Sequence, residues 1–416
     1  MTAATITLGC RLNFAESEAM AAGAPDGTLI VNSCAVTGEA VRQTRQAIRR
    51  AYRDQPERPI IVTGCAAQLD PEGFAAMPEV ARVIGNGAKT HHNPFVSSEV
   101  ETRLAGGERP STTLGTNGRV YTPDFSDRPP AAAGLIHQVK SFVAVQTGCD
   151  HRCTFCTIWT ARGPSRSVAY DEVRSAVARE LGRGAKEIVL TGVDITDYAG
   201  GLGLLCQRLL ADLPDLKRLR LSSLDSIEID GALLELIAGE PRLMPHFHLS
   251  LQAGDDMVLK RMKRRHLRRD AVATVDAIKR ARPDATIGAD LIAGFPTESE
   301  EAALNTLALL DDCDVISAHV FPFSPRPGTP AARMPQVERE LVKARAARLR
   351  AHAEARRMSW LDSLIGTCQR VLIENERGHG HGESNSPILL ADAAKGEIHD
   401  AVVTARDGNQ LIGTYQ

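Results

Sequence analysis

The sequence predicts an α/β protein in three parts: an open parallel α/β domain, a partial (β/α)6 barrel and a small C-terminal β-barrel. Strand-like and helical patterns alternate over residues 1–108 and again, in longer units, over residues 135–364. Such alternation is typical of parallel sheets. Residues 365–416 instead hold short β-rich runs separated by Gly, Asn and Asp, a pattern that predicts a small all-β module.

Length and composition agree with a globular protein of several domains. The chain has 416 residues, 43% of them hydrophobic and 24% charged; at about 150 residues per domain, this length predicts two or three domains. Lys and Arg number 49 against 51 Asp and Glu, so nucleic-acid binding would have to rest on local patches. We expect no membrane association and a cytoplasmic location, because neither a spanning apolar stretch nor a signal-peptide pattern is found.

The first domain is expected to alternate buried parallel strands with helices. Its strands are predicted at Thr5–Leu8, Thr28–Asn32 and Ile60–Thr63, and its helices at Glu16–Ala22 and Val41–Arg53. Residues 109–134 collect Gly, Pro, Thr and Asp with little periodicity, which predicts a linker.

The central part is expected to repeat a strand followed by a helix, with its chemistry at the carboxyl ends of the strands. The strands are predicted at Ser141–Gln146, Glu187–Thr191, Arg218–Ser222, His246–Leu251, Thr286–Ile292 and Ile316–Phe321. The helices are predicted at Tyr170–Leu181, Leu204–Leu210, Ile229–Ala238, Arg269–Arg280 and Glu298–Leu310, followed by a long one at Gln336–Leu364. The C-terminal strands are predicted at Arg370–Glu374, Ile388–Leu390, Ala401–Thr404 and Leu411–Tyr415.

Three cysteines lie close together after the first strand of the predicted barrel. Cys149, Cys153 and Cys156 form a C-x3-C-x2-C run, and in a cytoplasmic protein thiols this close together predict a metal centre rather than disulfides. Three thiolates can hold a 4Fe-4S cluster and leave one iron open for a substrate, with the aromatic Phe155 shielding one side. Structural zinc is the alternative, but such sites need four ligands and usually come as two C-x2-C pairs.

A second set of cysteines lies in the first domain. Cys10, Cys34 and Cys65 each follow a predicted strand, so in a parallel sheet their thiols collect at the carboxyl edge, where α/β folds bind ligands. We expect them to hold a second cluster. The alternative is that each is a small buried apolar residue at a tight turn.

The cysteine run with its aromatic residue resembles the signature of the radical S-adenosylmethionine (AdoMet) enzymes. The resemblance implies that the open iron binds AdoMet and that one electron cleaves its sulfonium into methionine and a 5′-deoxyadenosyl radical. It also implies that the partial barrel is the fold of this superfamily. AdoMet contacts are expected from Phe155 and from polar or turn residues at three strand ends: Gly192, Asp194, Ser250, Gln252, Asp290 and Ile292. The alternative for these residues is a plain turn or a helix cap.

Together, the three parts of the chain resemble the methylthiotransferase family of these enzymes over nearly the whole length. Matching pieces include ARGPSRS (161–167), LTGVDI (190–195) and DLIAGFPTE (290–298). The resemblance implies that a C–H becomes C–SCH3: one AdoMet methylates a sulfur held at the second cluster, and another supplies the radical. AdoMet, two 4Fe-4S clusters and a reductant such as flavodoxin or ferredoxin are therefore implied.

Three substrates compete within this family. The segments TLGCRLNFAESEA and VNSCAVTGEA resemble the branch that modifies C2 of N6-threonylcarbamoyladenosine at position 37 of tRNA. The isopentenyladenosine branch usually has Gly-Cys-Gln-Met-Asn and the ribosomal-protein aspartate branch Gly-Cys-Pro-Lys-Asn; Arg11 and Leu12 fit neither. The anticodon stem-loop of tRNA is thus the expected partner. A zinc protein that binds RNA and a radical AdoMet methylase with one cluster remain as alternatives.

Several further residues have two interpretations. Arg162 and Arg166 are expected either to bind an anion or to form structural ion pairs. The basic run at residues 261–269 is either a solvated helix face or a phosphate contact. His379 and His381 are expected in an exposed Gly-rich turn. The C-terminal module resembles the TRAM domain, a β-barrel associated with RNA binding in this family.

Overall fold

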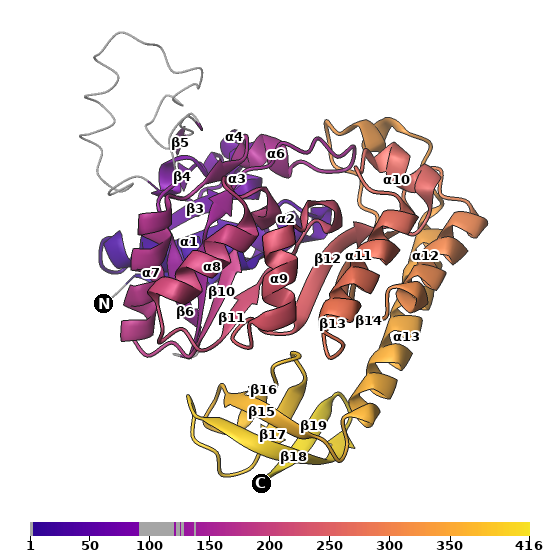
Figure 1. The fold of residues 1–416 in the computed structure, drawn as a ribbon. Coiled ribbons are helices and arrows are strands. Elements are labelled where there is room, and N and C mark those ends of the chain that lie inside the picture. The colour runs from indigo at the N-terminus through magenta and orange to yellow at the C-terminus, as the bar shows by residue number, and fades with distance from the viewer. Residues whose placement is uncertain (1–2, 91–119, 122–124, 126–128, 137–138) are drawn as a thin grey trace.

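The computed structural model describes residues 3–90, 120–121, 125, 129–136 and 139–416. In these residues the protein consists of an N-terminal open sheet, a central partial barrel and a C-terminal closed barrel (Figure 1). The fold class predicted from the sequence is confirmed. No helix in the described part of the chain is long and apolar enough to cross a membrane.

The described residues of the N-terminal domain form a five-stranded parallel sheet in the order β1-β2-β3-β4-β5. The strands are β1 (Ala4–Thr7), β2 (Leu29–Ser33), β3 (Ile60–Gly64), β4 (Arg82–Ile84) and β5 (Val120–Tyr121). The helices are α1 (Arg11–Gly23), α2 (Gly38–Asp54), α3 (Cys65–Leu69), α4 (Pro71–Ala75) and the 3-10 turn η1 (Ala88–Thr90). Helices cover both faces of β2 and β3, so every residue of these strands is buried.

The central strands form two sheets that continue one another around a curved wall. One has the order β11-β10-β7-β6 and the other β12-β13-β14; bridges at Leu219–Leu243 and Leu224–Leu249 join them. The strands are β6 (Ala133–Ile136), β7 (Lys140–Ala144), β10 (Glu187–Thr191), β11 (Leu219–Leu221), β12 (His246–Gln252), β13 (Thr286–Ala293) and β14 (Val315–Pro322), with the small pair β8 (Gln146–Thr147) and β9 (Arg166–Ser167). All are parallel within the two larger sheets except β6, which runs antiparallel to β7.

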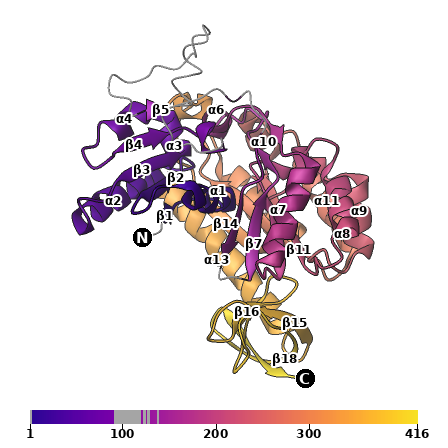
Figure 2. The same ribbon diagram turned by 90° about the vertical axis from the view of Figure 1, so that its left-hand side faces the viewer.

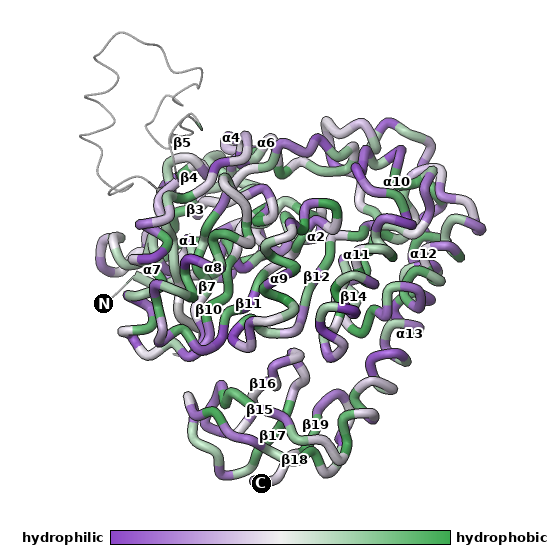
Figure 3. Tube along the Cα trace, viewed as in Figure 1, coloured by the Kyte–Doolittle hydropathy of each residue, from purple (hydrophilic) through white to green (hydrophobic). Residues whose placement is uncertain are grey.

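The helices of this part pack on the outside of the wall, except α6, which packs against α3 of the N-terminal domain. They are α6 (Ile158–Arg162), α7 (Tyr170–Gly182), α8 (Leu202–Asp212), α9 (Gly231–Gly239), α10 (Asp256–Met262), α11 (Arg268–Ala281), α12 (Glu300–Asp312) and α13 (Arg339–Ser363), with 3-10 turns η2 (Ile195–Asp197), η3 (Ser226–Glu228) and η4 (Pro330–Arg333). The largest apolar core lies between these helices and the strands, and Figure 3 shows apolar residues gathered in the strands.

The N-terminal domain closes the inner side of the wall. Leu12 and Ala15 of α1 are buried against Phe142 and Ala144 of β7, and Figure 2 shows α1 between the N-terminal sheet and the barrel strands. β5 lies inside the segment predicted as a linker and extends the N-terminal sheet. β6 begins in the last two residues of that segment and extends the barrel sheet. Most of the segment lies outside the described residues, so the linker stays a prediction.

The C-terminal module is a closed barrel in the order β15-β16-β17-β19-β18. Its strands are β15 (Cys368–Ile373), β16 (His379–His381), β17 (Pro387–Leu390), β18 (Ile398–Asp407) and β19 (Gln410–Tyr415). It packs below the amino ends of the barrel strands (Figure 1), where Lys140 pairs with Glu374 at 2.8 Å. The exposed-turn interpretation of His379 and His381 is wrong, because both lie in β16 and pair with β17.

Candidate functional site

The three N-terminal cysteines lie at one edge of the sheet, as parallel order requires. Cys34 directly follows β2, Cys65 directly follows β3, and Cys10 begins the loop-to-helix turn after β1. A Cβ on Gly9 would lie 2.8 Å from the Sγ of Cys34, so the backbone next to Cys10 contacts Cys34. The pKa of Cys10 is raised by burial, and the charge of Cys65 raises it further.

A glycine with positive φ sets the approach to Cys65. Gly64 has φ +99° and ends β3, and a Cβ there would collide with the Ser33 backbone and lie 2.6 Å from Oδ1 of Asn32. Any other L-residue is both strained and too large at this position. This clash explains why the residue before Cys65, at the end of β3, is glycine.

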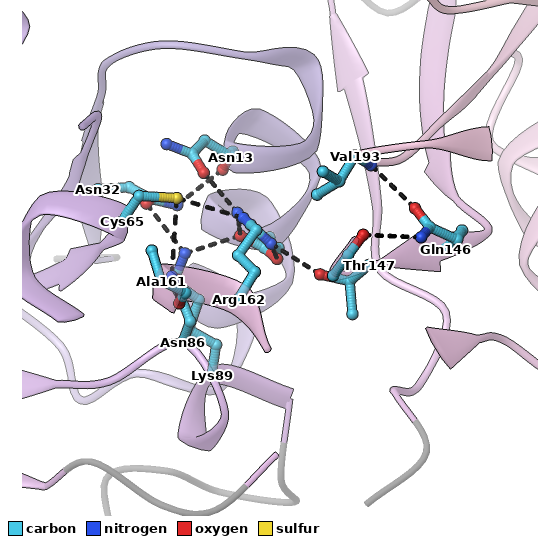
Figure 4. A network of polar contacts seen from close by, with 12 residues as sticks. Asn13, Asn32, Cys65, Asn86, Lys89, Gln146, Thr147, Ala161, Arg162 and Val193 are labelled. Atoms are coloured by element: carbon cyan, nitrogen blue, oxygen red, sulfur yellow. Dashed lines mark hydrogen bonds and ion pairs between the residues drawn. The ribbon is translucent and has the colours of Figure 1, made fainter. Parts of the chain in front are cut away.

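Arg162, at the end of α6 in the barrel domain, reaches into the N-terminal domain (Figure 4). Its side chain is 2% exposed. The guanidinium pairs with Glu16 at 2.7 Å and donates to Oδ1 of Asn13 at 2.7 Å and to Oγ1 of Thr147 at 3.0 Å. Its Nε donates to the Sγ of Cys65 at 3.3 Å. Of the two interpretations of Arg162, the structure shows the structural ion pair.

The same network includes a second buried cation and a second donor to sulfur. Lys89 donates to Glu16 at 2.7 Å and to Oδ1 of Asn32 at 3.1 Å. Burial acts to raise the pKa of Glu16, but the charges of Arg162 and Lys89 lower it to about 2. Asn86 donates from Nδ2 to the Sγ of Cys65 at 3.7 Å. Two N–H donors, from Asn86 and Arg162, therefore face the sulfur of Cys65.

The second cysteine set lines a cavity of about 180 Å³ at the carboxyl ends of the barrel strands. Cys149, Cys153 and Cys156 all contribute to its wall. The loop is tightly folded: Cys149 N donates to Gly163 O at 3.1 Å, and Cys156 N donates to Cys153 O at 3.1 Å. This arrangement brings the three cysteines to the wall of one cavity.

The structure places some of the predicted AdoMet contacts at this cavity and others away from it. The predicted residues that line it are Phe155, Asp194, Ser250 and Gln252. A Cβ on Gly192 would lie 2.8 Å from the backbone oxygen of Gln146. Asp290 contacts His248 at 2.9 Å and His319 at 3.1 Å, and Ile292 is buried in an apolar cluster with Phe295. The expected AdoMet contacts of Gly192, Asp290 and Ile292 stay predictions.

His151 and Arg264 are among the cavity residues that were not predicted as site residues. His151 stands inside the cysteine run and pairs with Asp194 at 3.0 Å, and its hydrogen bonds to Asp194 and Glu228 raise its pKa to about 10. Arg264 pairs with Asp225 at 2.8 Å and approaches the Sγ of Cys153 at 3.8 Å. Arg264 belongs to the basic run, so for this residue the surface interpretation is wrong. The spacing of the cysteines does not indicate that His151 or Arg264 would lie at the cavity.

The donor sets fit iron–sulfur clusters. Burial raises the pKa of Cys149 to about 12, of Cys156 to about 11 and of Cys34 to about 11; binding a metal through these thiols would release their protons. Backbone and guanidinium N–H groups face the sulfurs, including Ile158 N at 3.3 Å from Cys156. Hydrogen bonds of this kind tune cluster sulfurs.

Comparison with known proteins agrees with this geometry. The model of the radical SAM superfamily matches residues 143–310, and that of the uncharacterized protein family UPF0004 matches residues 2–85. The threonylcarbamoyladenosine tRNA methylthiotransferase MtaB of Rickettsia prowazekii is 41% identical over 92% of this chain and 90% of its own length. The chain belongs to the MtaB-type tRNA methylthiotransferases. Family membership implies an enzyme that uses AdoMet and a 4Fe-4S cluster on tRNA, so the zinc-protein alternative fails.

More distant relatives of these methylthiotransferases span similar lengths. The protein of the same name in Bacillus subtilis is 33% identical, covering 82% of this chain and 78% of its own. The tRNA-2-methylthio-N(6)-dimethylallyladenosine synthase of Sorangium cellulosum is 31% identical over 90% and 82%. Among solved structures, the radical S-adenosylmethionine methyltransferase TsrM of Kitasatospora setae has a TM-score of 0.55 at 15% identity, covering 74% of this chain and 66% of its own. That likeness concerns the fold.

Proposed function

We propose that this methylthiotransferase acts on N6-threonylcarbamoyladenosine at position 37 of tRNA and produces its 2-methylthio derivative, using two 4Fe-4S clusters and two AdoMet. The identities support this substrate: relatives named for threonylcarbamoyladenosine are 33 to 41% identical, against 30 to 31% for those named for dimethylallyladenosine. The opening with Arg11 and Leu12 supports the same choice.

The observation that supports the two-cluster proposal is the hydrogen bond from Arg162 to Cys65 across the domain boundary. Cys10, Cys34 and Cys65 share one sheet edge, and Arg162 joins that edge to the loop that holds the other set. The charge of Cys65 also contributes to raising the pKa of Cys156, after burial and the nearer Cys153. Two clusters bound here would lie close enough to share a substrate.

The two cysteine sets would have different roles. Cys149, Cys153 and Cys156 would hold the cluster that, when bound, supplies the electron for cleaving the sulfonium of AdoMet. Cys10, Cys34 and Cys65 would hold the cluster that carries the sulfur.

Residues around the cavity would prepare it for AdoMet. Asp194 offers a carboxylate for the ammonium group of AdoMet, and His151 orients it. Phe155 covers the cavity, and Ser250 and Gln252 line it with hydrogen-bonding groups. A reductant such as flavodoxin or ferredoxin would provide the electrons.

The substrate is tested with anaerobically reconstituted enzyme, AdoMet and a chemical reductant. Two anticodon stem-loops that carry threonylcarbamoyladenosine or isopentenyladenosine at position 37 are incubated separately and digested to nucleosides for mass spectrometry. We expect the methylthio product from the first RNA. Product from the second RNA instead would assign the enzyme to the other branch.

Single cysteine substitutions separate the proposed roles. Cys153→Ala should abolish AdoMet cleavage, whereas Cys34→Ala should retain part of the cleavage and lose the methylthio nucleoside. Cys206→Ala is a matched control, because Cys206 is buried in the apolar core outside either set. Methylthiolation by the Cys34 variant would contradict the sulfur-carrier role.

A further inference from the structure

Arg11 is the first residue of α1 and directly follows Cys10. Its guanidinium lies over the ring of Phe142, 5.6 Å from the centroid. Phe142 belongs to β7, against whose inner face α1 packs. The Arg11 side chain therefore stands between the N-terminal cysteines and the inner wall of the barrel.

Arg11 is exposed to solvent, and its guanidinium lies on the side of β7 that faces α1. Loss of solvation lowers the pKa of Arg11, and the charge of Arg220 lowers it further, while Glu187 and Asp290 raise it. Those three residues lie on β11, β10 and β13, that is, on both sheets of the wall. Because the guanidinium lies over Phe142 on the inner face of β7, the Arg11 side chain is on the concave side of the wall.

Arg11 differs from its neighbours in lacking an anionic partner. Arg218 and Arg220 each pair with Glu187 at 3.0 Å, and Arg162 pairs with Glu16. Among the residues that the structure describes, none forms an ion pair or a side-chain hydrogen bond with Arg11. An accessible cation without a carboxylate, held in a concavity, is suited to an anionic ligand.

Part of the wall offers flat rings. The rings of His248 and His319 have centroids 4.6 Å apart. Both rings contact Asp290, so that carboxylate already has two hydrogen-bond partners. The His319 side chain is 60% exposed, and its ring lies 6.5 Å from that of Phe321. Exposed rings of this kind stack with bases turned out of an RNA strand.

We propose that Arg11 binds the carboxylate of the threonyl group of the substrate nucleoside and so determines substrate specificity. The inference rests on the proposed function, because threonylcarbamoyladenosine carries a carboxylate and isopentenyladenosine carries an uncharged hydrocarbon at the same nitrogen. A guanidinium binds a carboxylate through two parallel hydrogen bonds. In this arrangement the adenine base stacks on the exposed ring of His319, and its N6 substituent points toward α1.

The test compares two stem-loops that differ in one charge. One carries threonylcarbamoyladenosine and the other its neutral methyl ester, and binding to the reconstituted enzyme is followed by fluorescence anisotropy. Wild type should prefer the acid. Arg11→Gln should bind the acid roughly ten- to hundred-fold more weakly and the ester as wild type does. Arg50→Gln, at an 81% exposed side chain on α2, removes the same charge and should keep the preference.

The outcomes separate the inference from the function on which it rests. Equal weakening of both RNAs by Arg11→Gln would show a phosphate contact and overturn the proposal, as would an unchanged preference. Should the Gln variant fail to bind iron, Arg11→Lys keeps the charge, and its retained preference for the acid tests the same point. If wild-type enzyme does not methylthiolate the acid-bearing RNA at all, the proposed function fails instead.

Discussion

The Nε of Arg162 donates a hydrogen bond to the Sγ of Cys65 at 3.3 Å, across the boundary between the barrel and the N-terminal domain. The same guanidinium forms a buried ion pair with Glu16 of α1. One side chain, just after the loop of one cysteine set, therefore contacts a sulfur of the other set. The ion pair and the hydrogen bond add to the packing that holds the two domains together.

Removing the Arg162 guanidinium should lower the free energy of unfolding strongly. Arg162→Met leaves Glu16 and Lys89 as a reduced buried pair, and losing one partner of such a network costs about 3–5 kcal/mol. Urea unfolding should show this loss, and iron bound by the N-terminal cysteines should fall. Arg50→Met, at an exposed pair with Asp54, should change stability by less than about 0.5 kcal/mol. Equal effects of the two substitutions would contradict the account.

The turn before Cys65 should tolerate no side chain. Gly64→Ala places a methyl group against the backbone of Ser33 at φ +99°, and positive φ together with the clash should cost roughly 3 kcal/mol. Gly23→Ala is the control, since a Cβ there meets nothing within 4 Å and should change stability by about 1 kcal/mol at most. Urea midpoints measure both. A Gly64 variant as stable as wild type would show that this turn is not constrained.

The stability gained by docking the C-terminal barrel should decrease as the pH becomes acidic. Burial acts to raise the pKa of Glu374, but His381 and Lys140 lower it to about 2 from 4.5. A lowered carboxyl pKa stabilises the fold above pH 4.5 and loses that contribution as pH falls through about 2. At pH 7, Glu374→Gln should be less stable by up to about 3 kcal/mol.

The stability difference between Glu374→Gln and wild type should close between pH 4.5 and 2. Urea unfolding of both cluster-free proteins over this range measures it. A difference that does not change with pH would mean that the charge of Glu374 contributes nothing to docking.

Much of the fold was predictable because local patterns decide it. The strand Glu187–Thr191 was predicted with its observed bounds, since a β-branched run is buried on both faces there. Strand β16 was missed, because His379 and His381 flank a glycine in a segment with turn composition. Its strand identity comes from pairing with β17 across the closed barrel, which is long-range information.

The candidate site was predictable in its cysteines and less so in its partners. Cysteines after parallel strands must meet at one edge, so their placement follows from topology. The partners of Cys65 come from residues 86 and 162, and sequence spacing does not indicate which distant donor reaches a sulfur. Asp290 gives a further example: sequence spacing does not indicate that its carboxylate contacts His248 and His319.

The most direct test of the account is the iron and sulfide content after anaerobic reconstitution. Wild type is compared with a variant in which Cys149, Cys153 and Cys156 are all Ala. Two 4Fe-4S clusters predict about eight irons per chain in wild type and about four in the variant. A fall from about four to none would show that Cys10, Cys34 and Cys65 hold no cluster, and would contradict the two-cluster account.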